Sequence, residues 1–529
     1  MTNNSGILQG MTVLDCSQIL AGPYCSMILA DMGARVIKIE KPKGGDDIRT
    51  WGPFKNGESV GFMNLNRNKE SIVIDFKSPE GIDVMKSLVK KSDVIIENYR
   101  TGTMEKLGLG YEELKKINNK IIYCSISGFG RTGPYSKRAG FDLVAQGMSG
   151  LMSITGHPDN PPAKVGVPIA DLNTGMFALS AIEAAYINLL KNNKGQYIEV
   201  SLLESALAYT VWESTGYFFN NEISEPLGSA HRVSAPYQAL KTKDGFLNVA
   251  APNQSNWERL CDAIYRKDLK SNKKFIDNTE RMKNIKDLEK ELERTFMKKN
   301  RSEWIEILDE AGVPCGPINK INEVWDDPQI KYRKMRIKTS HPKTGEVDNI
   351  GVVSKFLENP SSVRSPAPTL GEHTEKVLED FGYDKNKTRV GLEYNEMLNA
   401  KTYKDPFSDH NLSGFSGYIS QNFSENSSVF FRYDSLESNI VSGSSEPWNS
   451  GKDGKLMILG FEHVVTKGFK LNLNYRNYNY NDNSINNNTV TELAFIPNSC
   501  IDGRYFVCIG YPKFQLDAAP SNPVIYKVI

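Results

Sequence analysis

The chain of 529 residues lacks a charge excess of either sign and lacks long apolar runs. Its 64 lysines and arginines nearly balance 63 aspartates and glutamates, so no overall field favours nucleic acid or an anionic membrane surface as a partner. No apolar stretch reaches the length that spans a bilayer. The first ten residues, MTNNSGILQG, show no basic segment followed by an apolar core. We expect a cytoplasmic globular protein that binds neither nucleic acid nor membrane.

Cysteine is scarce and scattered. The seven cysteines form no CxxC pair and no cluster with histidine at metal-ligand spacing, and their number is odd. This pattern excludes a disulfide framework and disfavours a metal centre. We expect free thiols in a reducing compartment at Cys16, Cys25, Cys124, Cys261, Cys315, Cys500 and Cys508.

Short β-branched runs alternate with helical segments in the first part of the chain. This alternation predicts βαβ units and an α/β fold with a mainly parallel, Rossmann-like sheet. The expected strands are residues 11–17, 34–40, 71–76, 93–99 and 120–129, and the expected helices are residues 23–33, 81–92 and 111–118.

Composition changes along the chain predict four segments. Residues 1–229 form the first part of a large domain, and residues 230–330 form a smaller α+β domain with a hairpin around Lys243, Asp244 and Gly245. Residues 331–395 return to the large domain, which is therefore discontinuous. Residues 396–529 alternate aromatic or apolar with polar residues, a pattern typical of antiparallel strands, and form a β-rich extension of unknown role.

The first predicted strand, turn and helix invite a dinucleotide-binding interpretation. A helix that begins after a glycine turn can hold phosphate, and Glu40 after the second strand could hold a ribose. The turn reads LAGP instead of GxGxxG, however, and Pro23 removes an amide donor that a pyrophosphate would need. The sequence therefore disfavours a dinucleotide site.

Asp171, in the stretch GVPIADLNTGMFA, stands where a long apolar helix is expected to begin. One interpretation is a helix N-cap. Another is a nucleophile, because a carboxylate with an ordinary pKa of about 3.9 is ionised at neutral pH and needs no general base. Unpaired amides at the helix start would then lie ready to hold an oxyanion. The local sequence does not choose between the two.

Several blocks together resemble a known family. These are LAGPYCSMILADMGARVIKIEKPKGGDDIRTWGP, LNRNKESIVIDFKSPEG, DVIIENYRTGTMEKLGLGYEEL, SISGFGRTGPYSKRAGFDLVAQGMSGLMSITG, GVPIADLNTGMFA and PTLGEHTEKVL. In this order, between about residues 7 and 390, they resemble the class III CoA-transferases, a family that includes formyl-CoA and carnitine CoA-transferases and α-methylacyl-CoA racemases. The segments GSAHRVSAPYQALKTKDG and GVPCGPIN are most similar to succinyl-CoA-dependent dicarboxylate CoA-transferases.

The resemblance implies an enzyme that moves CoA from an acyl-CoA, here succinyl-CoA, to a small dicarboxylic or hydroxy acid. It implies that Asp171 is the nucleophile, through an aspartyl anhydride and an aspartyl-CoA thioester. Coenzyme A enters as a substrate thioester, with no metal and no permanently bound cofactor. The resemblance also implies an interlocked homodimer, in keeping with a discontinuous domain.

Residues that contact CoA follow from the same resemblance, position by position. One position departs from the pattern: Ala139 stands where some relatives have lysine, and Lys137 or Arg138 would replace it. The implied contacts are Leu20, Ala21, Lys41, Ile74, Asp75, Phe76, Lys77, Asn98, Tyr99, Arg100, Lys106, Arg138, Ala139, Gly140, Phe141 and Asp142. Four of them are cations suited to the phosphates of CoA.

For the acceptor, His231 and Arg232 are candidates because a guanidinium binds a carboxylate through two hydrogen bonds, and Gln18 and Tyr135 are further candidates for the pocket. Two other functions stay open. A racemase needs a second acid or base, but Phe141 replaces the histidine of the racemases' Gly-His-Asp motif, so His157 or His231 would have to supply it. The third possibility is a non-catalytic CoA-binding protein.

Overall fold

A computed structural model describes residues 6–383, 389–400, 409–424, 427–442, 454–466, 469–480 and 488–497. The chain divides into two compact units, Met1–Val377 and Leu378–Ile529. The domain boundaries that the sequence indicates, at residues 230, 331 and 396, stay predictions.

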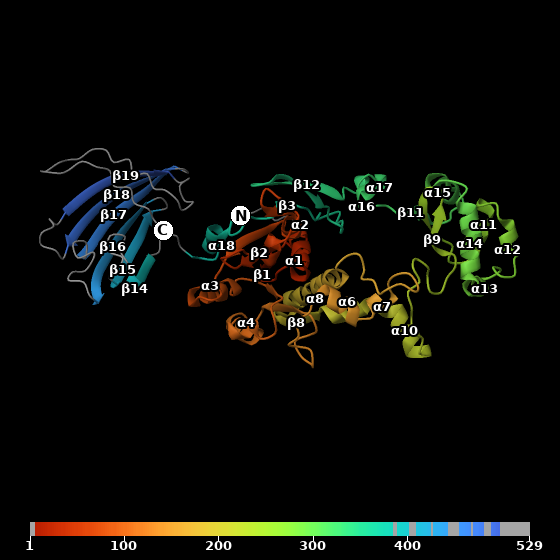
Figure 1. Cartoon of the computed structure of the whole chain (residues 1–529), viewed down its shortest axis with the longest axis horizontal. Helices are drawn as coiled ribbons and strands as arrows, with labels where there is room; N and C mark the ends of the chain where they lie inside the picture. The colour runs from red at the N-terminus through yellow and green to blue at the C-terminus, as the bar shows by residue number, and fades with distance from the viewer. Residues whose placement is uncertain are drawn as a thin grey trace. The chain divides into compact units, whose positions relative to one another are not determined.

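A six-stranded sheet lies in the part of the first unit that contains α1, α3 and α8 (Figure 1), in the order β5-β2-β1-β6-β7-β8. Every neighbouring pair in it is parallel, which confirms the predicted α/β fold. Its strands are β1 (Thr12–Asp15), β2 (Arg35–Glu40), β5 (Lys69–Val73), β6 (Val94–Glu97), β7 (Ile122–Ser127) and β8 (Gln196–Ser201).

Helices of this unit cover the sheet. The helices α1 and α8 pack against each other (Figure 1) and share one hydrophobic core with β1, β6 and β7. The helices up to Asn220 are α1 (Ala21–Asp31), α2 (Val60–Leu65), α3 (Pro79–Val89), α4 (Thr103–Lys106), α5 (Tyr111–Ile117), α6 (Asp142–Met148), α7 (Leu151–Ile154), α8 (Ile169–Asn192), α9 (Leu202–Leu207) and α10 (Val211–Asn220). Short 3-10 turns lie at Asp47–Thr50 and Ala208–Thr210.

Local sequence explains several of these boundaries. Ser78 accepts a hydrogen bond from the Gly81 amide, and Pro79 occupies the first turn of α3, so this helix starts with a capping residue and a proline. After α1, Gly33 has a φ of 105° and approaches the Gly6 backbone so closely that a Cβ atom would lie 2.8 Å from the Gly6 Cα. Only glycine suits that position.

The strand order creates a switch point between β1 and β6. From β1 the chain continues to β2 and β5 on one side, whereas β6, β7 and β8 lie on the other side. In sheets of this kind, ligands bind in the crevice at the carboxyl ends of the strands where the order reverses. We therefore expect a ligand site at the turns that follow β1 and β6.

A second hydrophobic core lies between Ala235 and Val313. It combines an antiparallel sheet, in the order β11-β10-β9, with helices, as expected of the smaller α+β segment. The predicted hairpin is confirmed, because β9 and β10 pair with Thr242 opposite Gly245. The elements are β9 (Tyr237–Thr242), β10 (Gly245–Ala250), α11 (Gln254–Ala263), α12 (Lys267–Lys270), α13 (Asn278–Lys283), α14 (Ile285–Phe296), α15 (Arg301–Glu310) and β11 (Cys315–Pro317).

The segment 362–374 lies beside the edge strand β5. The His373 amide donates to the Ser71 carbonyl at 2.9 Å, and the Val73 amide donates to Thr374 Oγ1 at 3.1 Å. Further along the same segment, the Asn68 side chain accepts from the Arg364 amide at 2.6 Å. These contacts join chain positions about 300 residues apart.

The remaining elements of the first unit are short. Two hairpins join β3 (Phe54–Lys55) to β4 (Glu58–Ser59) and β12 (Arg336–His341) to β13 (Gly345–Ile350). The remaining helices are α16 (Ile321–Val324), α17 (Pro328–Tyr332) and α18 (Thr374–Asp380). The boundary between the two units, after Val377, falls within α18.

The second unit contains a six-stranded antiparallel sheet in which each strand pairs with the next along the chain. This confirms the predicted β-rich extension. Ile419, Phe431, Leu459 and Tyr475 lie directly opposite one another across four strands, and all four are exposed. The strands are β14 (Arg389–Ala400), β15 (Asp409–Ser424), β16 (Ser427–Ser442), β17 (Gly454–Thr466), β18 (Phe469–Tyr480) and β19 (Asn488–Pro497).

None of the helices in the described ranges is long and apolar enough to cross a membrane. Of the seven cysteines, five lie in those ranges and carry free thiols, four of them buried. Cys500 and Cys508 lie outside the described residues.

Candidate active site

The residues predicted to contact CoA follow the carboxyl ends of five strands. Because all these strands are parallel, their carboxyl ends lie at one edge of the sheet. Leu20 and Ala21 follow β1, Lys41 follows β2, Ile74–Lys77 follow β5, Asn98–Arg100 and Lys106 follow β6, and Arg138–Asp142 follow β7. The fold therefore gathers at one edge what the sequence spreads over more than 120 positions.

Asp171 lies in the first turn of α8 and is half-buried. The helix begins at Ile169, and its N-cap is Pro168, so the N-cap interpretation of Asp171 is wrong. Within the described part of the chain, no side chain or backbone amide donates a hydrogen bond to the Asp171 carboxylate. Because the Asp171 carboxylate accepts none of these hydrogen bonds, both of its oxygens are available for a reaction.

Asp142 caps α8 from another helix. Its Oδ1 accepts from the Ala170 amide at 2.8 Å and from the Asp171 amide at 3.4 Å. Its Oδ2 accepts from Gln146 Nε2 at 2.7 Å, and Gln146 Oε1 in turn accepts from the Val165 amide at 2.9 Å. Asp142 was expected to contact CoA, and the structure gives it this capping role, which the sequence did not indicate.

These contacts overturn one expectation. The amides at the start of α8 were expected to be unpaired and ready to hold an oxyanion. Instead, Asp142 accepts from the amides of Ala170 and Asp171, and the Leu172 amide donates to the Pro168 carbonyl at 3.1 Å. Donors for an oxyanion must come from elsewhere at this edge.

The environment of Asp171 changes its acidity. Burial, and secondly the neighbouring charge of Asp142, raise the pKa of Asp171 to about 7. The expectation of an ordinary pKa and full ionisation at neutral pH is therefore wrong for Asp171. A raised pKa also makes the carboxylate a stronger nucleophile when it is ionised.

The turn after β1 lies beside Asp171. Gly175, one helical turn after Asp171 on the same face of α8, lies against Ala21, and a Cβ at Gly175 would come within 2.8 Å of the Ala21 carbonyl oxygen. The turn is joined to β6 by two hydrogen bonds: the Gln18 amide donates to Asn98 Oδ1 and Asn98 Nδ2 donates to the Gln18 carbonyl, both at 2.8 Å. The switch point is thus bridged by two residues that the sequence singled out.

The segment Asn98–Arg100 is held in place by Arg131, which the sequence did not single out. Arg131 Nη1 donates to the Tyr99 carbonyl at 2.7 Å, and its Nη2 pairs with Glu97 at 2.6 Å. Burial is the first cause that raises the pKa of Glu97, and the Arg131 charge opposes it. Glu97, a glutamate at the end of a buried strand, is the feature of the sequence that could have predicted a paired cation such as Arg131.

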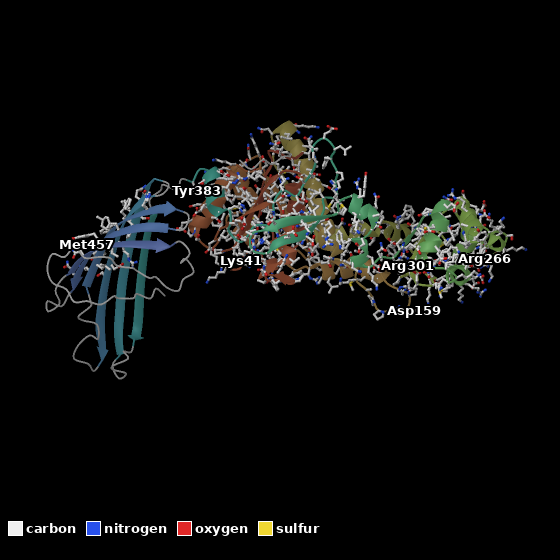
Figure 2. All side chains as sticks on the ribbon, turned by 90° about the horizontal axis from the view of Figure 1, so that it is seen from above. Lys41, Asp159, Arg266, Arg301, Tyr383 and Met457 are labelled. Atoms are coloured by element: carbon white, nitrogen blue, oxygen red, sulfur yellow. The ribbon has the colours of Figure 1, made fainter. Side chains whose placement is uncertain are left out.

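The predicted cations are exposed at this edge. Lys41 lies at the protein surface (Figure 2) and pairs with Asp47, with both side chains about half exposed. Among the described residues, no ion pair engages the side chains of Lys77, Arg100 or Lys106, and all three are exposed. Three free cations at one edge suit a ligand with several phosphates.

The loop before α6 contributes an exposed aromatic and cationic surface. The Arg138 guanidinium lies 4.6 Å from the Tyr135 ring centroid and 5.3 Å from the Phe129 ring centroid. Ala139 and Phe141 are also exposed, and Gly140 packs against Gly128. Lys137 and Arg138 are both exposed, and which of them replaces the lysine expected at the Ala139 position stays a prediction.

The predicted acceptor residues are not brought to the sheet edge by any described contact. Arg232 Nε donates to Glu213 on α10 at 2.8 Å. The His231 ring lies 5.0 Å from the Tyr237 ring, and His231 Nδ1 accepts from the Val233 amide at 3.2 Å. His157 lies against Gly228. Their roles in acceptor binding or proton transfer stay predictions.

Comparisons with known proteins agree with one another. Residues 8–374 match the family model described as CoA-transferase family III. The chain is 39% identical to succinyl-CoA:glutarate CoA-transferase of Mus musculus, over 72% of this chain and 87% of that protein. It is 38% identical to succinate–glutarate CoA-transferase of Agrobacterium fabrum, over 72% of this chain and 97% of that protein.

A solved structure has the same fold. The crystal structure of a CAIB/BAIF family protein from Brucella suis superposes with a TM-score of 0.65 and 37% sequence identity, and the match covers 71% of this chain and all of that chain. The family model covers the whole parallel sheet, since it matches residues 8–374 and the last strand of the sheet ends at Ser201.

Proposed function

The chain belongs to CoA-transferase family III, and from that membership we propose that it moves CoA from succinyl-CoA to a dicarboxylic or hydroxy acid with Asp171 as the nucleophile. The observation that carries the assignment of Asp171 is its free carboxylate. It lies half-buried at the carboxyl edge of the sheet, one helical turn from the contact between α1 and α8.

The first half of the reaction activates the carboxylate. An oxygen of ionised Asp171 attacks the thioester carbonyl carbon of the donor, the carbon–sulfur bond breaks, and CoA leaves as a thiolate. The product is a mixed anhydride between Asp171 and the donor acid. The thiolate then attacks the aspartyl carbonyl carbon, which releases the donor carboxylate and leaves an aspartyl-CoA thioester.

The second half reverses these steps with a new acid. The acceptor carboxylate attacks the aspartyl-CoA thioester, CoA thiolate leaves, and a second mixed anhydride forms. The thiolate attacks the acceptor carbonyl carbon, so that acceptor-CoA forms and Asp171 is regenerated as a carboxylate. Each step exchanges one activated acyl bond for another, so no external energy source is needed.

Charges and packing at the edge support this course. In this proposal the exposed Lys77, Arg100 and Lys106, which form no ion pair with any described residue, bind the CoA phosphates, and Asp142 fixes the backbone that carries Asp171. The choice of succinyl-CoA and of a dicarboxylate rests on the names of the two relatives described above.

A direct experiment tests the assignment. The protein is incubated with succinyl-CoA and a panel of mono-, di- and hydroxycarboxylic acids, and new acyl-CoA species are followed by mass spectrometry, with hydroxylamine trapping at Asp171. We expect exchange with dicarboxylates and a hydroxamate on Asp171, and we expect Asp171→Asn to lose at least about 10³-fold in kcat, because the covalent route is then closed. Exchange by the Asn variant would refute the nucleophile.

The same experiment addresses the alternatives. Phe141 is exposed beside Asp142 and cannot move a proton, which disfavours the racemase. Loss of configuration at the carbon next to the thioester, without exchange, would indicate a racemase. Binding of CoA without either reaction would indicate a non-catalytic CoA-binding protein.

A homodimer is part of the proposal. The helices α8 and α10 expose large apolar side chains, among them Leu190, Trp212, Phe218 and Phe219, the last at 82% exposure. A second copy of the chain is the occupant we propose for this surface, in keeping with the family resemblance. Light scattering should give a dimer for the natural chain and a monomer for Phe219→Asp, with Tyr265→Asp, a change at another exposed aromatic, remaining dimeric.

A cytoplasmic location, on the ground of the free thiols, completes the proposal.

A further inference from the structure

The turn between β1 and α1 contains a backbone conformation that is rare for its residue type. Ile19 has a φ of 70°, in the left-handed region. A β-branched side chain disfavours this region strongly, so such residues persist there only when neighbouring groups hold them in place. The residues on either side, Gln18 and Leu20, were both singled out by the sequence as contacts of substrate or CoA.

Buried side chains hold this turn through its backbone. The Ile19 amide donates to Asp46 Oδ1 at 3.0 Å, and the Ser17 carbonyl accepts from Lys38 Nζ at 2.9 Å. Asn98 holds the intervening residue on both its amide and its carbonyl. Three side chains, from β2, from the segment after β2 and from the segment after β6, therefore fix three successive residues.

Asp46 is the residue that holds Ile19, the residue in the left-handed conformation. Its two oxygens have separate partners: Oδ1 accepts from the Ile19 amide at 3.0 Å and from the Ile48 amide at 3.1 Å, and Oδ2 pairs with Lys38 Nζ at 2.8 Å. The paired side chains of Lys38 and Asp46 are 0% and 1% exposed. The Asp46 amide is itself anchored, since it donates to Glu40 Oε2 at 2.9 Å.

The charge balance keeps this arrangement rigid. Burial lowers the pKa of Lys38, but the carboxylates of Asp46 and Asp15 outweigh burial and raise this pKa above its ordinary value. Lys38 therefore stays protonated and can be satisfied only by acceptors. A fixed cation beneath the turn leaves Asp46 a single orientation that serves both partners.

The position of the turn links this rigidity to the reaction. Ala21 packs against Gly175, one helical turn from Asp171, and the turn lies at the switch point of the strand order, where sheets of this kind bind ligands. A change in the backbone at Ile19 would move Leu20 and Ala21 relative to the nucleophile.

We propose that Asp46 is a positioning residue for CoA transfer, which holds Ile19 in the left-handed conformation and thereby sets Leu20 and Ala21 against the donor thioester beside Asp171. This proposal rests on the proposed function. Asp46 acts through Ile19 and contacts no reacting atom.

Substitutions at Asp46 and Ile19 separate positioning from simple stability. In Asp46→Asn, a single oxygen remains, so an NH2 group, which donates and cannot accept, faces either Lys38 or the Ile19 amide. Asp46→Glu keeps the charge for Lys38 and moves the acceptor away from the amide. Ile19→Gly accepts the left-handed conformation without strain and makes the clamp less necessary. Asp31→Asn is the matched control, because it breaks another buried pair, with Arg67, in the same unit.

Three measurements are made on each full-length variant: the Kd of CoA by titration calorimetry, the KM and kcat of CoA exchange, and the melting temperature. We expect Asp46→Asn and Asp46→Glu to raise the donor KM and the Kd of CoA by about tenfold or more, since a displacement near 1 Å at a reacting centre can cost up to 10²-fold. The acceptor KM should stay within about twofold. Adding Ile19→Gly to Asp46→Asn should restore the donor KM to within about threefold of the natural protein.

The control defines the contrary outcome. Asp31→Asn should lower the melting temperature and leave the donor KM and the Kd of CoA unchanged. If the Asp46 variants behave in the same way, or if Ile19→Gly brings no recovery, the positioning role is overturned. Absence of exchange by the natural protein would instead overturn the proposed function, and the Kd of CoA would still decide the role of Asp46.

Discussion

At the scale of single residues, the proposed role of Asp171 makes its acidity decisive for the reaction. Burial and the charge of Asp142 raise its pKa to about 7, and only the ionised form attacks a thioester. Physiological pH therefore lies on the slope of this titration. A small change near Asp171 will change the active fraction of the enzyme.

The first prediction is a pH profile. Because activity needs ionised Asp171, kcat/KM for the donor should rise with pH through about 7 and level off above it, and at pH 6 it should be about tenfold below the plateau. Initial rates of exchange between pH 5.5 and 8.5 measure it.

Asp142→Asn is the matched variant for this profile. Its amide oxygen can still accept from Ala170, while the like charge that raises the pKa of Asp171 is removed. The midpoint should move to lower pH. A midpoint that stays in place would assign the shift to burial alone, and a flat profile would contradict the titration of Asp171.

The second prediction concerns stability. The folded-state pKa of Asp171 lies above its ordinary value of 3.8, so the folded protein binds more protons than the unfolded chain between about pH 4 and 7. Stability is therefore lost as the pH rises through this window. Asp171→Asn should unfold at a higher temperature than the natural protein at pH 8, with a gain of about 1 to 2 kcal/mol. Melting curves at pH 5 and pH 8 test this, and an equal gain at both values would contradict it.

At the scale of elements, the order of strands decides which residues meet. The sequence predicted the strands, since buried parallel strands are continuous β-branched runs. It could not predict their order, nor that the turns after β1 and β6 lie side by side, because both depend on contacts far apart in the chain. Asp142 is the clearest case: its place in the first turn of α6 gives no sign that it caps α8, 28 residues later.

The third prediction tests one of these long-range contacts. Thr374 Oγ1 accepts from the Val73 amide at the edge of the sheet. Thr374→Val keeps the shape and leaves this amide without its partner, so it should lower the free energy of unfolding by about 1 kcal/mol. Urea unfolding measures the change. Thr369→Val removes an exposed hydroxyl contact with Glu372 and should have a smaller effect; equal effects would mean that Thr374 does not fasten the edge.

At the scale of the whole molecule, the two units have different surfaces and different requirements. All the residues assigned to CoA transfer lie in Met1–Val377, and the family match ends at residue 374. The sheet of the second unit instead exposes a row of four apolar side chains. Nothing in the described contacts makes the reaction depend on this second sheet.

The fourth prediction follows from that division. A chain that ends at Tyr383 should fold, keep kcat and donor KM within about twofold of the full chain, and keep its oligomeric state. It should also bind less of a hydrophobic dye, because the apolar row is removed. Exchange assays, light scattering and dye fluorescence measure these properties. A loss of exchange beyond about tenfold would show that the extension serves the enzyme.

The buried pair of Lys38 and Asp46 has a thermal consequence. The cost of removing ions from water falls as temperature rises, because the hydration of charged groups carries a strongly negative entropy. An ionic contact beneath the turn therefore weakens less on warming than exposed contacts do. Affinity for CoA should accordingly persist nearly until the unit melts as a whole, and the loss of the donor site and the loss of the fold should occur at the same temperature.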